Sequence, residues 1–261
     1  MLRSLIDEPA PLFAVMLLAL LLAAEIGCRL ARLTSIRNDE ELHVQIVAAR
    51  DAIGLLLSLL LAFTLAMVLP RFTLRKQLIV DEANAIGTTW LRAQLLTEPA
   101  RGNIMGLLRT YLDARTAFSD AGLRQSELQA SLSHAKQVQY ELWEQTVEAA
   151  QFNPTFNTTN FLQSLNQAID LSEERLAAQE NRVPGVLWFI LIFMSLLACF
   201  LVGCSMRRRF LLVMILWPLM ISTVLALNAD LDSPRAGFIQ VNQESIKRLQ
   251  EDFNGVAGQR K

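Results

Sequence analysis

The sequence predicts an all-α integral membrane protein with four transmembrane helices and an inserted soluble helical bundle. Hydrophobic residues make up 52% of the 261 residues and charged residues only 19%, a balance typical of membrane proteins. The apolar residues gather in four blocks of membrane-spanning length, two on each side of a long polar segment. The two-residue alternation expected of β-strands is missing. The sequence therefore predicts that the lipid bilayer is a partner of this chain.

The first transmembrane helix is predicted over residues 11–28. Pro11 stands in the first turn, where its missing N–H costs no hydrogen bond. The preceding residues include two carboxylates and the apolar run is too long for a secretion signal, so we expect the helix to be retained. Glu25 lies within this block, and a carboxylate inside a membrane segment is a functional candidate. Alternatively, Glu25 pairs near the helix end with Arg29, four residues later.

A polar connection, residues 29–51, leads to the second transmembrane helix, residues 52–70, which completes the first helix pair (11–70). The nineteen residues of that second helix carry no charge and span about 28 Å, the hydrocarbon thickness of a bilayer. The second half of the connection looks helical, with Asn38 and Glu41 as a capping box. We expect it to merge with the membrane helix, which continues at its other end into the soluble bundle.

Residues 71–182 are predicted to fold as a soluble bundle of about four helices. Apolar residues recur there with the 3.6-residue period of amphipathic helices, and turn formers at residues 153–159 separate the last two helices. The expected core stripes are Ile79, Ala83, Ile86, Trp90 and Ala93; Ile104, Leu107, Leu108, Tyr111, Leu112 and Phe118; Leu128, Leu132, Ala135, Val138, Leu142 and Val147; and Phe161, Leu165, Ala168, Ile169 and Leu176.

The second pair of transmembrane helices is predicted over residues 183–206 and 210–227. Only three consecutive arginines separate the two helices, so we expect an antiparallel hairpin. Pro218 lies in the middle of the fourth helix, where its missing N–H is expected to produce a kink. The polar C-terminal tail, residues 228–261, contains a short amphipathic helix.

Composition and motifs argue against several function classes. The formal net charge of −1 gives no attraction to nucleic acid. The sequence has no phosphate-binding glycine loop, HExxH, CxxC or GxSxG motif, and His43 and His134 lie about 90 residues apart. We therefore expect no enzyme activity, no cofactor and no metal site. Cys28, Cys199 and Cys204 lie in or beside apolar blocks, which favours packing roles and excludes an extracellular disulfide framework.

The arginines of the short loops give one indication of orientation. Seven lie in the 29–51 connection and the 207–209 link, against two, Arg3 and Arg235, on the opposite side. With the long soluble segment discounted, the positive-inside rule places both termini and the bundle outside the cytoplasm.

Three blocks of the sequence resemble one known family of membrane proteins. They are LLSLLLAFTLAMVLPRFTLRKQLIVDEANAIGTTWLRAQLLTEPAR, then NRVPGVLW, and then ADLDSPRAGFIQV after the fourth helix. Over residues 46–241 the chain is similar to the bestrophin-like domain family, whose members are mostly bacterial four-helix membrane proteins of unassigned function. That family is more distantly similar to the bestrophins, which are pentameric ion channels. The resemblance implies a multi-pass protein of a bacterial inner (plasma) membrane and a homo-oligomer, a pentamer if assembly follows the bestrophins.

The resemblance assigns a role to the second transmembrane helix, which lines the pore in bestrophins. There, apolar side chains one turn apart form a narrow neck before a glycine–phenylalanine pair. The matching positions here are Leu55, Leu59 and Phe63, with Ala62 in place of the glycine. Spacings of four residues put the three side chains on one stripe, and rings of such stripes can gate a pore by shedding water. The alternative is that the same stripe packs on the third and fourth helices or on lipid.

Other features of the bestrophins match less well. Bestrophins keep both termini and the bundle in the cytosol, the reverse of what the arginine count indicates. The calcium-binding acidic loop of the animal channels has no clear match, because Asp230 and Asp232 are too few for a calcium site. Asp81 and Glu82, about three turns beyond the membrane, could attract cations at the pore mouth. Charges on a solvated helix face explain these two residues equally well.

Two functions remain open from the sequence. The first is a homo-oligomeric ion channel of bestrophin-like type with no assigned selectivity, through which inorganic ions pass. The second is a non-conducting membrane scaffold or sensor whose helical bundle binds a partner protein. A pore on the second helix requires several copies of the chain around an axis, so the oligomeric state discriminates between the two.

Overall fold

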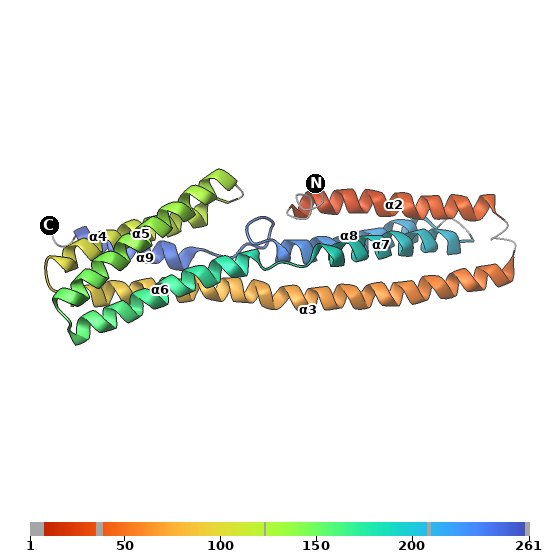
Figure 1. Cartoon of the computed structure of the whole chain (residues 1–261). Coiled ribbons are helices and arrows are strands. Elements are labelled where there is room, and N and C mark those ends of the chain that lie inside the picture. Colours follow the sequence, from red (N-terminus) through yellow and green to blue (C-terminus); the bar gives the residue numbers. More distant parts are fainter. Residues whose placement is uncertain (1–7, 35–38, 123, 208–209, 259–261) are drawn as a thin grey trace. The chain divides into compact units, whose positions relative to one another are not determined.

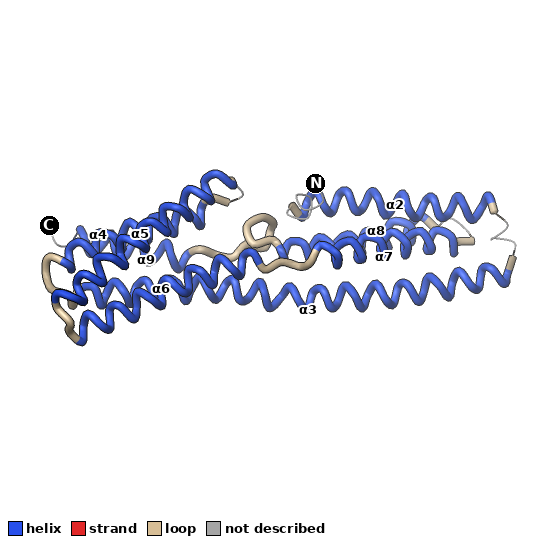
Figure 2. The backbone as a smooth tube through the Cα atoms, in the orientation of Figure 1, coloured by secondary structure: helices blue, strands red, loops and turns tan. Residues whose placement is uncertain are grey.

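A computed structural model describes residues 8–34, 39–122, 124–207 and 210–258. These residues form helices and connecting loops without a strand, as Figure 2 shows, which confirms the predicted all-α class. In chain order (Figure 1) the helices are α2 (Pro9–Leu33), α3 (Glu40–Ala93), α4 (Ala100–Asp120), α5 (Gln125–Phe152), α6 (Phe156–Glu180), α7 (Gly185–Ser205), α8 (Leu211–Asp232) and α9 (Glu244–Gly258).

The chain divides into two compact units, which we call the membrane unit and the bundle unit. The membrane unit comprises Met1–Phe72 and Arg182–Gln240, and the bundle unit comprises Thr73–Asn181 and Val241–Lys261. Helix α3 contributes residues to both, because it runs through Pro70 without ending. A proline is tolerated in a membrane helix where neighbouring groups satisfy the carbonyl that it leaves free.

Four helices, α2, α3, α7 and α8, are long and apolar enough to span a bilayer, as predicted. Helix α7 carries no charged residue. In α2 the carboxylate of Glu25 accepts a hydrogen bond of 2.7 Å from Arg29 Nε, four residues later. The alternative in which Glu25 pairs near the helix end is thus confirmed, and its presence in the apolar block needs no functional explanation.

Helices α2 and α7 cross at a pair of glycines. A Cβ atom at Gly27 would overlap with the carbonyl oxygen of Phe200, and one at Gly203 would overlap with that of Ala24. The two backbones are therefore in contact, through the small residues that let helices associate inside a bilayer. The thiol of Cys204 donates to the Gly27 carbonyl at 3.4 Å, and all three cysteines are buried and free, as a packing role predicts.

The start of α3 is set by an aspartate. Asp39 Oδ1 accepts the backbone N–H of Leu42 at 3.1 Å, which satisfies one of the N–H groups that every helix start leaves open. The predicted capping residue, Asn38, lies outside the described residues. Two residues before the apolar stretch, Arg50 Nη1 donates to Ser205 Oγ at the end of α7, at 3.2 Å.

Helix α8 continues to Asp232, whereas the sequence predicts an end at Leu227. Three of the five extra residues, Asn228, Asp230 and Asp232, are polar yet buried. Asn228 Nδ2 donates to the carbonyl oxygen of Val224 at 2.9 Å, one turn earlier on the same helix. Polar residues can thus extend a membrane helix when the helix itself or a nearby loop satisfies them.

The core of the bundle unit contains most residues of the predicted stripes, whereas Leu128, Leu132, Val147 and Leu176 are only partly buried and lie outside it. Helices α3, α4, α5, α6 and α9 all contribute, with Ile86, Leu142 and Phe161 among the fully buried side chains. The C-terminal helix α9 joins this core through Phe253, whose ring stacks on that of Trp90 with centroids 4.0 Å apart. The amphipathic helix predicted in the tail is therefore part of the bundle.

The substitution Gly203→Ala should destabilise the membrane unit, because the added methyl group meets backbone rather than a movable side chain. We expect a loss of about 1–3 kcal/mol, the usual cost of overpacking, seen as a lower midpoint of thermal unfolding in detergent. Gly54→Ala is the matched control, since nothing lies within 4 Å of a Cβ at Gly54 and alanine favours a helix. An unchanged midpoint for Gly203→Ala would contradict the close crossing.

Candidate pore helix and buried charge cluster

Within the membrane unit, α3 has one buried side. Leu57, Leu61, Thr64 and Val68 recur at helical spacing and are all buried. The Thr64 hydroxyl donates to the carbonyl oxygen of Leu60 at 2.7 Å, so it is satisfied by its own helix. This side is the seam through which α3 packs on the apolar core of the membrane unit.

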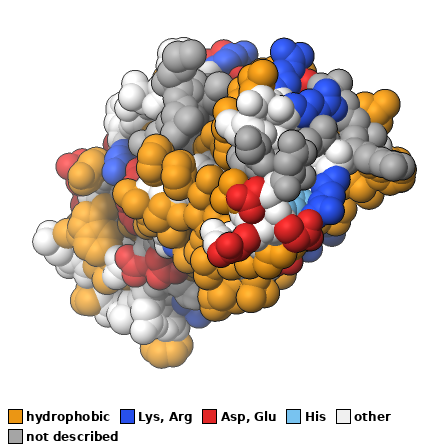
Figure 3. Space-filling model, turned by 90° about the vertical axis from the view of Figure 1, so that its right-hand side faces the viewer, with side chains coloured by type: hydrophobic (Ala, Val, Ile, Leu, Met, Phe, Trp, Pro, Cys, Tyr) orange, Lys and Arg blue, Asp and Glu red, His pale blue; other side chains and the backbone are white. Residues whose placement is uncertain are grey.

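The three predicted neck residues lie on the exposed side of α3. Leu55 is 71% exposed, Leu59 49% and Phe63 61%. None of the three belongs to the apolar core of the membrane unit, in which Leu57, Leu61 and Val68 lie. What lies outside this side of the chain is lipid or another copy. Figure 3, which looks at one end of the chain, shows hydrophobic side chains over much of that end with acidic and basic side chains among them.

Asp81 lies on the part of α3 that belongs to the bundle unit. Its Oδ1 accepts a hydrogen bond of 2.9 Å from Gln77 Nε2, one turn earlier. With Asn84, Thr88 and Gln167 it lines a pocket of about 270 Å³ between α3 and α6. The partly exposed carboxylate of Asp81 thus faces a polar groove on the surface of the bundle.

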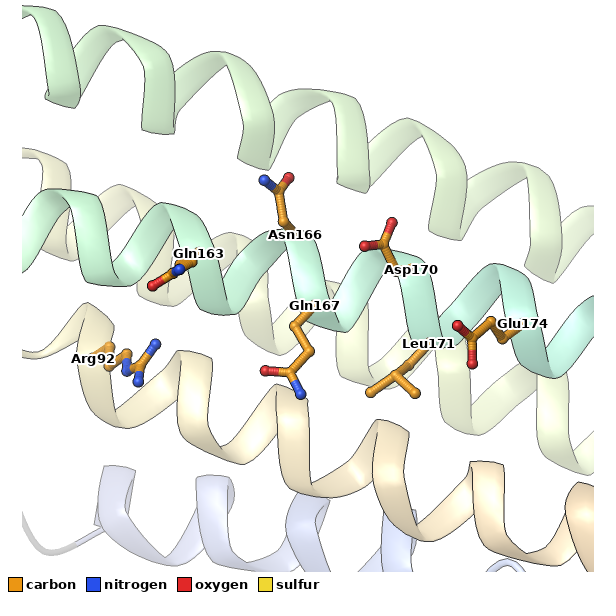
Figure 4. Close-up of a pocket in the computed structure, with 7 residues that line it drawn as sticks. All are labelled: Arg92, Gln163, Asn166, Gln167, Asp170, Leu171 and Glu174. Carbon is orange, nitrogen blue, oxygen red and sulfur yellow. The ribbon is translucent and has the colours of Figure 1, made fainter.

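A larger pocket of about 510 Å³ lies along the same two helices. In Figure 4, Gln167 and Leu171 point from α6 toward α3, which contributes Arg92, whereas Asn166 and Asp170 point away from α3. Amide, carboxylate and guanidinium groups line the pocket, without a nucleophile and base in contact. The two pockets are polar grooves along α3 and α6.

Glu82, the neighbour of Asp81, lies inside the bundle. Its side chain is completely buried between two arginines. Arg115 Nε donates to Glu82 Oε1 at 2.5 Å, and Arg175 Nη1 donates to Glu82 Oε2 at 2.6 Å. The interpretation of Glu82 as a charge on a solvated helix face is therefore wrong. A carboxylate held between two guanidinium groups is also shielded from ions in water.

We call Glu82, Arg115 and Arg175 the buried charge cluster. Arg175 Nη2 also donates to Ser119 Oγ at 3.0 Å and to Gln243 Oε1 at 2.9 Å. Burial lowers the pKa of Arg175, and the attraction of Glu82 offsets only part of this effect, so the pKa lies below its ordinary value. Burial acts on the pKa of Arg115 in the same direction, but Glu82 and other neighbours outweigh it and raise that pKa.

The sequence analysis missed the arginines of this cluster, although a signal was present. Arg115 lies three residues from Phe118 and four from Tyr111, on the predicted core stripe of α4. Arg175 continues the α6 stripe, seven residues after Ala168. A charged residue at a core position of an amphipathic helix predicts a buried ion pair rather than an exposed position within the apolar stripe.

Asp230 holds the loop that follows α8. Its two carboxylate oxygens accept the backbone N–H groups of Phe238 at 2.8 Å and Ile239 at 3.2 Å. The loop reaches it through Gly237, which has a φ of +106° and is so close to the carboxylate that a Cβ atom would overlap with it. Backbone N–H groups thus already bind the two carboxylate oxygens that a calcium ion would need.

Asp232 plays a similar part at the start of α7. It accepts the N–H of Val183 at 3.0 Å and lies 3.6 Å from Arg182 Nε. Within the described ranges, no group of three or more His, Cys, Asp or Glu side chains could hold a metal ion. Asp230 and Asp232 are therefore structural links, one to the loop after α8 and the other to the start of α7.

Four apolar helices with a helical bundle inserted after the second define a class of integral membrane protein that comparison with known proteins identifies. The family model of the Bestrophin-like domain matches residues 12–246, and the chain belongs to that family. This membership confirms the resemblance found in the three sequence blocks. No curated protein matches the chain.

The same fold occurs in solved structures. Two variants of a bacterial bestrophin homologue from Klebsiella pneumoniae superpose with TM-scores of 0.68 and 0.67, at 12% and 16% identity, and each match covers 94% of this chain and 99% of the other. A structure described as a membrane protein has a TM-score of 0.68 at 15% identity, over 93% of this chain and 98% of the other. At such identities the likeness establishes the fold.

The substitution Glu82→Gln should strongly destabilise the bundle unit, because it leaves two buried guanidinium groups without their carboxylate. We expect a loss of about 3–5 kcal/mol, measured as a lower midpoint of thermal unfolding by circular dichroism. Asp81→Asn, at the adjacent exposed position, is the matched control and should change stability by about 0.5 kcal/mol or less. Equal midpoints for the two variants would show that the cluster does not stabilise the bundle.

Proposed function

We propose that this protein is a homo-oligomeric ion channel of bestrophin-like type in the plasma membrane of a bacterium. Several copies would place α3 around a central axis, with Leu55, Leu59 and Phe63 as the apolar neck. Family membership and the shared fold with bacterial bestrophin homologues support this proposal.

The observation that carries the proposal is the contrast between the two sides of α3. One side is buried in the membrane unit, whereas the three neck residues project outward at successive turns. In an assembly, copies of this stripe would form rings of apolar side chains. Such rings close a pore to ions by excluding water, and a modest widening lets water and ions through.

The pore mouth depends on Asp81 rather than on Glu82. Asp81 is partly exposed beside a polar groove, so its charge can act on ions that approach α3. Glu82 is fully buried and neutralised by arginines, so it contributes no comparable field to the solvent. Selectivity is left unassigned.

One observation favours the second candidate function, a non-conducting scaffold or sensor. Phe152 is 93% exposed and Phe156 81% exposed, on either side of the α5–α6 turn of the bundle unit. Two large exposed aromatic side chains only four residues apart in sequence are typical of a protein-binding surface. A scaffold would use this turn to bind a partner protein.

Native mass spectrometry in mild detergent should find one assembly of several copies, a pentamer if the bestrophin arrangement holds. The physical reason is that a single α3 cannot enclose a pore, so the exposed stripe requires neighbours. A monomer or dimer that retains a second polypeptide would instead support the scaffold. Phe152→Ser combined with Phe156→Ser should then release that polypeptide and leave a pentamer unaffected.

The double substitution Leu59→Ala and Phe63→Ala should raise conductance severalfold in planar-bilayer recordings of the purified protein, because smaller side chains make the neck wider and easier to wet. Leu212→Ala is the control, since Leu212 is exposed on α8 and has no place in the neck. The neck assignment fails if neither protein conducts, or if the double variant conducts like the unmodified chain.

A further inference from the structure

The buried charge cluster holds more positive than negative charge. Arg115 is 2% exposed and Arg175 1% exposed, and both guanidinium groups share the single carboxylate of Glu82. Both also lie over the ring of Phe118, at 4.9 and 5.5 Å from its centroid. A buried charge without a partner is strongly unfavourable, so a group of opposite charge is expected nearby.

The surrounding side chains do not supply the missing negative charge. Burial raises the pKa of the Tyr111 phenol above its ordinary value, so that this group stays neutral at neutral pH. Glu173 is the other carboxylate that acts on Arg115, but it is 51% exposed and lies 3.5 Å from Lys136 Nζ. The remaining hydrogen-bond partners of Arg175, Ser119 and Gln243, carry no charge.

The same two arginines each have a buried N–H group with no acceptor. Arg115 Nη2 and Arg175 Nε are fully buried atoms without a hydrogen-bond partner. Buried donors are nearly always satisfied in folded proteins, because leaving one open forfeits the bond that it made to water. The excess charge and the open donors therefore occur on the same pair of side chains, and a water molecule could satisfy only the donors.

We propose that the buried charge cluster binds a small monovalent inorganic anion, chloride or one of similar size, at Arg115 Nη2 and Arg175 Nε. A single anion would offset the excess positive charge of the cluster and would accept hydrogen bonds from both open N–H groups. This site lies inside the bundle unit and uses no residue of the neck. Anion binding and ion conduction can therefore succeed or fail independently.

The test is thermal unfolding of the full chain in detergent, with sodium chloride replaced stepwise by sodium gluconate at constant ionic strength. Gluconate is too large for a packed helical interior, so only chloride should act. We expect the midpoint to rise with the logarithm of the chloride concentration once this exceeds the dissociation constant, by about 5 °C or more at a hundredfold excess. A midpoint that does not depend on which anion is present overturns the proposal.

Variants separate anion binding from a purely structural role. Arg115→Gln leaves one guanidinium for one carboxylate, so the chloride-dependent shift should disappear. Glu82→Gln leaves two buried positive charges, so its shift should become larger than that of the unmodified chain, although the variant is less stable. Arg101→Gln, an exposed position on the same helix, should keep the full shift. A full shift in Arg115→Gln, or a reduced one in Glu82→Gln, contradicts the site.

A second measurement does not depend on any variant folding. Crystals of the unmodified protein grown with bromide in place of chloride should show an anomalous scattering peak beside Arg115 and Arg175. Bromide has nearly the size of chloride and the same charge, so it should occupy the same site. The absence of a peak at this position overturns the proposal, whatever the conductance of the protein.

Discussion

A bilayer offers the polypeptide backbone no water to bond with, and the membrane unit depends on this constraint. Every N–H and C=O group at membrane depth has to find its partner within a helix. Hydroxyl groups obey the same rule, because Thr64, Ser195 and Ser222 each donate to a carbonyl oxygen four residues earlier on their own helix. Helices satisfied in this way present apolar surfaces, and their association then depends on close packing such as the crossing of α2 and α7.

The bundle unit faces water, so the opposite constraint applies to it. A charged side chain costs little free energy at the surface of this unit and much in its interior. Asp81 and Glu82 are adjacent on α3, about 100° apart around the helix axis. That rotation puts one carboxylate beside a polar groove and the other between two arginines. Position on the helix, more than residue type, decides which charge can act on ions and which one belongs to the core.

The fold could be predicted from the sequence because the pattern of hydrophobic residues in each segment indicates whether lipid or water surrounds it. Four apolar blocks give four membrane helices, and the apolar stripe from Ile104 to Phe118 gives the buried face of α4. Periodicity also finds the stripe of Leu55, Leu59 and Phe63, but what the stripe faces depends on contacts with other molecules. The buried charge cluster was not predicted, because Glu82 is 33 residues from Arg115 and 93 residues from Arg175 in sequence. Local patterns do not show which distant residues meet in the fold.

The close backbone contacts of α2 and α7 at Gly27 and Gly203 have a mechanical consequence. Two helices that touch carbonyl to backbone cannot slide along each other without a collision, so α2 and α7 have to move as one rigid body. Helix α3, by contrast, meets the membrane unit through Leu57, Leu61 and Val68, long or branched side chains that can change rotamer. The softest degree of freedom of the membrane unit is therefore the displacement of its second transmembrane helix against an otherwise stiff frame.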